Sequence, residues 1–228
     1  GDPKKEIGMV FQDPMTSLNP TMKIGDQIAE GMIYHRLAKR REARAKAIEL
    51  LQLVGIHDPE ARFDHYPHQL SGGQRQRVLI AIAIACHPKL LIADEPTTAL
   101  DVTIQAQILD LIQQMQQHFQ MSLLLISHDF GVIASLCERV LVMYAGKIVE
   151  SGPVDEVLQA PKHPYTQMLL DSIPRLDRPR NAPLKAIEGS PPSLWAPPQG
   201  CPFRERCPYA AWKCREEPSG PVACWRAK

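Results

Sequence analysis

Short apolar runs alternate with longer, mixed stretches over most of the chain. The runs at 90–93 and 122–127 are rich in Leu and Ile and are bounded by polar residues. Such runs predict strands of a parallel sheet, buried on both faces. Another strand is expected to end within 6–11. A hairpin is expected where 139–144 and 147–150 flank Ala145-Gly146.

Helices are predicted between these strands. Residues 22–54 are expected to be helical, because 40–54 is rich in Ala, Glu, Lys and Leu and Gly55 suits a helix C terminus. Residues 74–86 and 102–119 also have helical composition. The alternation of buried strands with helices predicts an α/β fold with a mostly parallel sheet, whose carboxyl ends carry the chemistry.

Proline and cysteine mark a change near residue 174. Of the 21 prolines, 11 lie between Pro174 and Pro221. Four of the six cysteines lie in the same stretch: Cys201, Cys207, Cys214 and Cys224. A loop-rich tail is therefore expected to follow the conventional body.

Composition narrows the class of protein. The 228 residues are 44% hydrophobic and 22% charged, as in an ordinary soluble domain with a core. Lys and Arg number 26 against 25 Asp and Glu, which gives no basic excess for binding nucleic acid. No apolar run approaches the roughly 18 residues of a membrane span, and no signal peptide is visible. We therefore expect any link to a membrane to run through partners.

The segment Ser71-Gly72-Gly73-Gln74 opens a predicted helix. Its small residues leave backbone N–H groups uncovered, and the helix dipole adds partial positive charge, so the segment suits a phosphate. A flexible turn before a core helix is the alternative interpretation.

Acidic and imidazole groups follow the two apolar strands. Asp94 and Glu95 end the first strand, and His128 follows the second. One carboxylate could bind Mg²⁺ on a nucleotide, and its neighbour could polarise a water as general base. The imidazole could hydrogen-bond a γ-phosphate or the water. Acidic turn residues and a structural histidine are the alternatives.

Together these segments resemble the ATP-binding-cassette (ABC) ATPase family. Residues 70–74 resemble its signature motif, 90–95 its Walker B strand, 98–101 its D-loop, His128 its switch histidine and Gln12 its Q-loop glutamine. Residues 11–20, the segment His163-Pro-Tyr-Thr166 with Leu169-Leu170, and the cysteine-rich tail resemble the oligopeptide/dipeptide importer subfamily.

The resemblance implies a role for each matching residue. Gln12 would contact Mg²⁺ and sense the membrane subunit, and Asp94 would hold Mg²⁺. Glu95 would orient or deprotonate the water, and His128 would stabilise the γ-phosphate. Ser71, Gly72, Gly73 and Gln74 belong to the signature, which would close over the nucleotide of a partner ATPase. Asp101 would link the two sites.

One family motif is absent from the printed sequence. The phosphate-binding loop Gly-x-x-x-x-Gly-Lys-Ser/Thr (Walker A) has no match, since the only Gly-Lys pair is Gly146-Lys147 in the predicted hairpin. We therefore expect a fragment truncated before the Q-loop rather than a naturally degenerate subunit. We also expect weak ATP binding and negligible ATPase activity for this chain alone, with an apolar edge of the sheet left exposed.

The resemblance also implies an organisation and partners. We expect a remnant of the nucleotide-binding core over 1–12, a helical subdomain over 13–86, a catalytic core over 87–174 and the Pro/Cys-rich region over 175–228. The expected partners are a second, paralogous ATPase forming a heterodimer, two transmembrane permeases and, indirectly, an extracytoplasmic substrate-binding protein, with no nucleic acid. The chain would sit peripherally on the cytoplasmic face of the inner membrane.

Alternatives remain at this stage. An ABC ATPase acting outside transport, or an inert fragment serving as a metal-binding or interaction module, are the other functions considered. Dipeptides, oligopeptides, nickel and glutathione stay open as substrates.

The spacing of the tail cysteines is not that of common zinc modules or ferredoxins. The cysteine-rich tail resembles a motif that is associated with a 4Fe–4S cluster in some members of the subfamily; zinc or unligated thiols are the alternatives. The other two cysteines, Cys86 and Cys137, are expected to be buried small hydrophobes.

Overall fold

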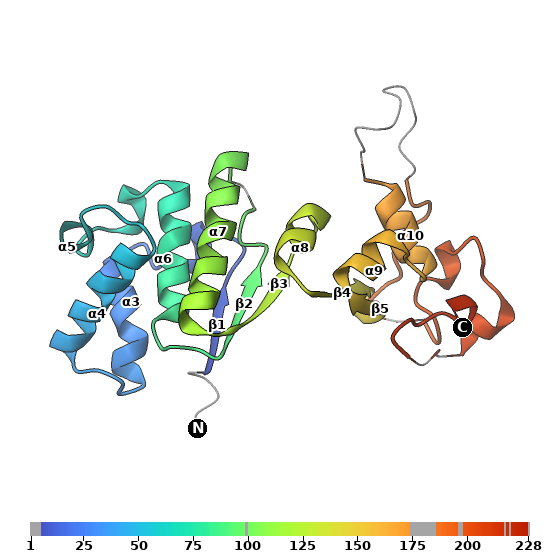
Figure 1. The fold of residues 1–228 in the computed structure, drawn as a ribbon, viewed down its shortest axis with the longest axis horizontal. Coiled ribbons are helices and arrows are strands. Elements are labelled where there is room, and N and C mark those ends of the chain that lie inside the picture. Colours follow the sequence, from blue (N-terminus) through green and yellow to red (C-terminus); the bar gives the residue numbers. More distant parts are fainter. Residues whose placement is uncertain are drawn as a thin grey trace. The chain divides into compact units, whose positions relative to one another are not determined.

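A computed structural model describes residues 6–98, 100–173, 186–195, 198–216, 218 and 220–227. Ala99 of the expected D-loop and the start of the expected tail, 174–185, lie outside the described residues. The chain forms two compact units, one up to Asp129 and one from Phe130 onward (Figure 1). The four-part division expected from the sequence stays a prediction.

The first unit is a three-stranded parallel sheet with helices packed against it. Its elements in chain order are β1 (Ile7–Val10), α2 (Pro14–Ser17), α3 (Ile24–Tyr34), α4 (Arg40–Leu53), α5 (Pro59–Arg62), the 3₁₀ turn η1 (Pro67–Gln69), α6 (Gly72–Ile84), β2 (Leu90–Asp94), α7 (Val102–Phe119) and β3 (Ser122–Ile126). The expected α/β fold with a parallel sheet is confirmed.

The sheet has the order β1-β2-β3, so β2 is its central strand. Leu91 pairs in register with Gly8 on one side and Leu123 on the other, which places these three residues on one face of the sheet. Helix α6 packs against that face at β1, and a Cβ on Gly8 would lie 2.2 Å from the Ala83 carbonyl oxygen. Glycine therefore allows the close approach of α6 to β1.

The helical part of this unit surrounds α6. Seven of the 13 residues of α6 are buried, and α3, α4 and α7 all pack against it (Figure 1). The expectation of one helical stretch over 22–54 was too coarse. The chain breaks between α3 and α4, where Arg36 adopts a left-handed φ of 57° and Leu37 donates its N–H to the Met32 carbonyl. Gly55 ends α4 with a φ of +77°, as expected.

The second unit is built around an antiparallel hairpin. Its elements are α8 (Phe130–Leu136), β4 (Arg139–Tyr144), β5 (Lys147–Pro153), α9 (Val154–Gln159), α10 (Pro164–Asp171) and three 3₁₀ turns, η2 (Arg204–Arg206), η3 (Trp212–Arg215) and η4 (Trp225–Ala227). Ala145 and Gly146 both have positive φ, which confirms the expected tight turn. The C-terminal segment adds a bridge to the hairpin between Glu150 and Val222.

Candidate functional site

The carboxyl ends of the three parallel strands bring the expected catalytic residues to one edge of the sheet. Gln12 lies two residues beyond β1, Asp94 is the last residue of β2 and His128 lies two residues beyond β3. Since the strands are parallel neighbours, these positions meet at the same edge. Glu95 follows Asp94 at the centre of that edge.

Three side chains donate hydrogen bonds to the Glu95 carboxylate. Gln12 Nε2 lies 2.8 Å from Oε2, and Thr98 Oγ1 lies 2.9 Å from the same oxygen. His128 Nδ1 lies 3.2 Å from Oε1. The carboxylate is thus held by groups from both neighbouring strand ends and from its own turn.

These contacts stabilise the ionised form of Glu95. Hydrogen bonding from His128 and then from Thr98 lowers the pKa of the carboxyl below its ordinary value, with a smaller contribution from Gln12 and against a desolvation effect that raises it. A carboxylate that is ionised at neutral pH accepts a hydrogen bond from a water molecule, which is the first requirement for orienting a nucleophile.

The backbone at Glu95 is also unusual. Its φ of 43° lies in the left-handed region, which non-glycine residues seldom occupy. The Glu95 N–H donates to the Ile126 carbonyl at 2.9 Å, and the Thr98 N–H donates to the Glu95 carbonyl at 3.1 Å. Neighbouring structure therefore fixes a conformation of the kind that clusters at functional sites.

Asp94 lies on the sheet face opposite α6. It pairs in register with Ile126 of β3, which is 45% exposed. The Asp94 carboxylate and the Gln12 amide oxygen are the hard oxygen ligands that Mg²⁺ prefers. The donor chemistry at this edge therefore fits a magnesium ion carried by a nucleotide.

The signature residues form a second location, at the start of α6. Ser71 Oγ accepts from the Gln74 N–H at 3.3 Å, and Gln74 Oε1 accepts from the Ser71 N–H at 3.0 Å. This reciprocal pair is a capping box, so Gln74 has a structural role beside any contact with a nucleotide. A Cβ on Gly73 would lie 2.8 Å from Ile104 Cγ2 of α7, whereas one on Gly72 would be in ordinary contact with Leu100.

Asp101 caps α7 in a similar way, because its Oδ1 accepts from the Ile104 N–H at 3.0 Å.

The structure therefore joins Gln12, Glu95 and His128 directly and places Asp94 beside them. It puts the signature residues at the start of α6 and Asp101 at the start of α7. Sequence reasoning named Thr98 only as part of the D-loop segment; a hydroxyl three residues beyond Glu95 in a tight turn was the signal for its contact.

Comparison with known proteins agrees with this arrangement. Residues 1–98 match the family described as "ABC transporter", and residues 149–214 match "Oligopeptide/dipeptide transporter, C-terminal region". The chain is 52% identical over 229 residues to a probable peptide ABC transporter ATP-binding protein of Sinorhizobium fredii, y4tR, covering 97% of this chain and 68% of that protein.

The chain belongs to the oligopeptide/dipeptide branch of the ABC transporter ATP-binding proteins.

Other relatives come from Bacillus subtilis. The chain is 53% identical to the dipeptide transport ATP-binding protein DppD, with 92% of this chain and 62% of that protein covered. It is 57% identical to the oligopeptide transport ATP-binding protein OppD, with 90% of this chain and 58% of that protein covered. The chain thus spans about three-fifths of the length of these two relatives.

Solved ABC ATPases share the fold. The cassette MJ0796 bound to ADP and Pi is 30% identical, with a TM-score of 0.57 over 65% of this chain and 63% of that one. CbiO1 from Clostridium perfringens, part of the ABC transporter complex cbiONQ, is also 30% identical, with a TM-score of 0.60 over 69% of this chain and 61% of that one. Within the part of the chain that the structure describes, no helix has the length and apolar character needed to cross a membrane.

The oligopeptide-type region of this ABC protein contains the expected His163-Pro-Tyr-Thr motif. His163 is buried and caps α10, since its Nδ1 accepts from the Tyr165 N–H at 3.1 Å. Its own N–H donates to Glu150 at 3.1 Å, and the Lys162 N–H donates to the same buried carboxylate at 2.7 Å. The motif therefore anchors α10 to β5.

The tail cysteines line one cavity of about 100 Å³ together with Phe203 and Trp225. Burial raises the pKa of the Cys201 and Cys207 thiols, and neighbouring tail cysteines make smaller contributions in the same direction. Over the described ranges, no group of three or more His, Cys, Asp or Glu side chains is placed to hold a metal ion. The structure gives no evidence for the expected 4Fe–4S cluster, which stays a prediction, with zinc and unligated thiols as its alternatives. Cys86 and Cys137 are partly buried free thiols, less buried than expected.

Proposed function

We propose that this chain forms part of the ATP-hydrolysing subunit of an importer that takes up peptides, and that it supplies the metal-binding and water-binding side of the ATP site. The observation that carries the proposal is the convergence of Gln12, Thr98 and His128 on the Glu95 carboxylate at the carboxyl edge of the sheet. The names of the relatives, which are dipeptide and oligopeptide transport ATP-binding proteins, support the substrate class.

In this proposal each residue at the sheet edge has one task. Asp94 and the amide oxygen of Gln12 would hold the Mg²⁺ that arrives with ATP, which would offset negative charge on the phosphates. Glu95 accepts a hydrogen bond from the attacking water and sets its direction. In the contacts that the structure shows, the carboxylate is held in its ionised form, in which it can accept a hydrogen bond from water.

His128 changes partner during the cycle. In the structure its imidazole binds Glu95, and 78% of its side chain is exposed at the sheet edge. An exposed imidazole can move to a γ-phosphate oxygen when nucleotide binds, and there it would stabilise charge that develops during transfer. Gln12 would likewise turn from Glu95 toward the metal.

Ser71, Gly72 and Gly73 are proposed to act on the nucleotide of a partner ATPase subunit. They lie at the N terminus of the 13-residue helix α6, where backbone N–H groups and the helix dipole favour an anion. Asp101 caps the N terminus of the neighbouring helix α7 and would lie at the same subunit interface. Two transmembrane permeases complete the proposed transporter, which this chain would join as a peripheral subunit at the membrane's cytoplasmic face.

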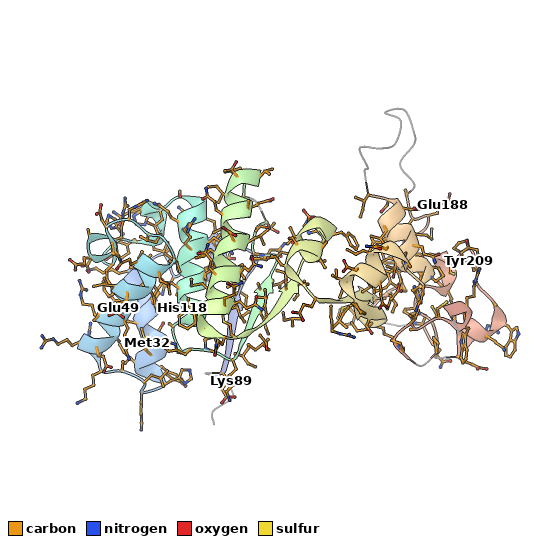
Figure 2. All side chains as sticks on the ribbon, viewed as in Figure 1. Met32, Glu49, Lys89, His118, Glu188 and Tyr209 are labelled. Atoms are coloured by element: carbon orange, nitrogen blue, oxygen red, sulfur yellow. The ribbon has the colours of Figure 1, made fainter. Side chains whose placement is uncertain are left out.

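The proposal is tested by peptide uptake. We expect the tagged protein to co-purify with two membrane permeases. Proteoliposomes containing that complex, with ATP on the side of the ATPase subunits, should take up labelled di- or oligopeptides, and Glu95→Gln should abolish the uptake. The matched control is Glu49→Gln on α4, an exposed residue labelled in Figure 2, which should transport normally.

Two results would contradict the proposal. One is purification without permeases, which would favour an ABC ATPase that acts outside transport. The other is peptide uptake by Glu95→Gln at the wild-type rate, which would remove Glu95 from the chemistry.

A further inference from the structure

Of the three groups that bind the Glu95 carboxylate, Thr98 differs from the other two. Gln12 and His128 come from the ends of β1 and β3 and are exposed. Under the proposed function both leave Glu95 to serve the metal and the nucleotide. Thr98 is partly buried and lies in the same tight turn as Glu95, so its hydroxyl can keep its hydrogen bond throughout the cycle.

The turn that carries Thr98 is fixed at several points. The Thr98 N–H donates to the Glu95 carbonyl at 3.1 Å and closes the turn. Gln105 Nε2 of α7 donates to the Thr97 carbonyl at 3.2 Å, and the Leu100 N–H donates to the same oxygen at 3.3 Å. The turn that carries the Thr98 hydroxyl is thus held by hydrogen bonds to its backbone, and neither Gln12 nor His128 takes part in them.

A glutamate side chain has several rotamers, and a water nucleophile must be held within a narrow range of positions. The Thr98 hydroxyl occupies one side of Oε2, while each carboxylate oxygen has two acceptor sites. One Glu95 oxygen can therefore be anchored by Thr98 while acceptor sites remain for the attacking water.

We propose that Thr98 is a positioning residue for the hydrolysis reaction: its hydroxyl fixes the rotamer of Glu95 after Gln12 and His128 have turned to the nucleotide. This inference rests on the proposed role of Glu95. It assigns Thr98 no contact with substrate and no share in proton transfer.

The test compares Thr98→Val, which keeps the shape and removes the donor, with Thr98→Ser, which keeps the donor. In the complete transporter that carries this chain, Thr98→Val should lower kcat for ATP hydrolysis about tenfold, the scale of one hydrogen bond to a charged group, and leave KM for ATP within about twofold. Thr98→Ser should recover kcat to within about threefold of wild type. A crystal structure of Thr98→Val with Mg²⁺ and a non-hydrolysable ATP analogue bound should show the Glu95 carboxylate in a different rotamer.

Each other outcome decides against the inference. A wild-type kcat in Thr98→Val would overturn it, as would a serine variant as slow as the valine variant, or a change confined to KM. If Thr98→Val does not assemble, Thr98→Ala takes its place in the same comparison. Glu95→Gln in the same preparation separates the two proposals. If Glu95→Gln hydrolyses ATP normally, the proposed function fails. If Glu95→Gln is inactive while Thr98→Val is as active as wild type, only the inference about Thr98 fails.

Discussion

Ser71, Asp101 and His163 each accept a backbone hydrogen bond at the start of a helix. All three belong to motifs that the sequence links to nucleotide binding or to the oligopeptide branch. Capping is therefore one physical reason for these residue types, and it acts beside any contact with a ligand. A loss of activity on substitution at these positions needs a measurement of stability before it is assigned to chemistry.

His163 gives a prediction about pH. Burial lowers the pKa of its imidazole, while Glu150 opposes the shift. Since the folded-state pKa is below the unfolded value of about 6.5, the unfolded chain binds the proton more tightly. The stability is therefore complete above about pH 6.5 and falls as the pH decreases below it, by at most about 1.4 kcal/mol per pH unit.

Denaturant unfolding at several pH values tests this expectation. All three tryptophans, Trp195, Trp212 and Trp225, lie in the tail, so their fluorescence reports on the second unit. The variant His163→Asn keeps a capping acceptor but does not titrate, and it should show a shallower loss of stability below pH 6.5. Equal pH dependence in the two proteins would contradict the account.

The packing of α6 against α7 explains why the two signature glycines differ as structural positions. The close approach of Gly73 to Ile104 leaves no room for a methyl group, and Ile104 is β-branched and stiff. We expect Gly73→Ala to destabilise the first unit by about 1–3 kcal/mol, the usual cost of overpacking. Gly72→Ala, whose methyl meets Leu100 at an ordinary distance, should be tolerated.

A double-mutant cycle checks the cause of this loss. Ile104→Ala should remove much of the penalty of Gly73→Ala, giving a coupling energy of about 1 kcal/mol or more in denaturation followed by circular dichroism. Additive effects, or equal costs at Gly72 and Gly73, would show that the contact between the helices is not the reason.

The elements differ in how far the sequence predicts them. The helix over Val102–Phe119 has the expected bounds, and the strands at 90–94 and 122–126 differ by one residue at one end. The composition that predicts these elements can be recognised in each segment by itself. The break between α3 and α4 was missed because Arg36 enters the left-handed region without a glycine or proline to signal it. The meeting of Thr98 with Glu95 depends on the turn geometry, which composition does not give.

Across the first unit, the sheet presents two unlike faces. The face that holds Leu91 and Ala93 is buried, whereas the opposite face carries exposed apolar side chains. These are Ile7, Met9, Leu124 and Ile126, between 37% and 48% exposed. Strands of a parallel sheet are normally covered on both faces. The face that carries Asp94 therefore has an exposed apolar surface.

The two compact units have separate hydrophobic cores, and the proposed chemistry uses the first of them. The residues of the proposed site all precede Phe130, where the second unit begins; they are Gln12, Asp94, Glu95, Thr98 and His128. The second unit contains the whole stretch, residues 149–214, that matches the oligopeptide/dipeptide C-terminal region. We therefore associate hydrolysis with the first unit and membership of the peptide branch with the second.

The central claim is that Glu95 directs the water that attacks ATP. Single-turnover hydrolysis of Mg-ATP by the complete transporter tests it most directly, with nucleotide binding measured on the same samples. Glu95→Gln should slow the chemical step at least about 100-fold, the usual contribution of a positioned general base, while ATP affinity stays within about twofold and Glu49→Gln behaves as wild type. Hydrolysis by Glu95→Gln at the wild-type rate, with ATP bound normally, would contradict the account.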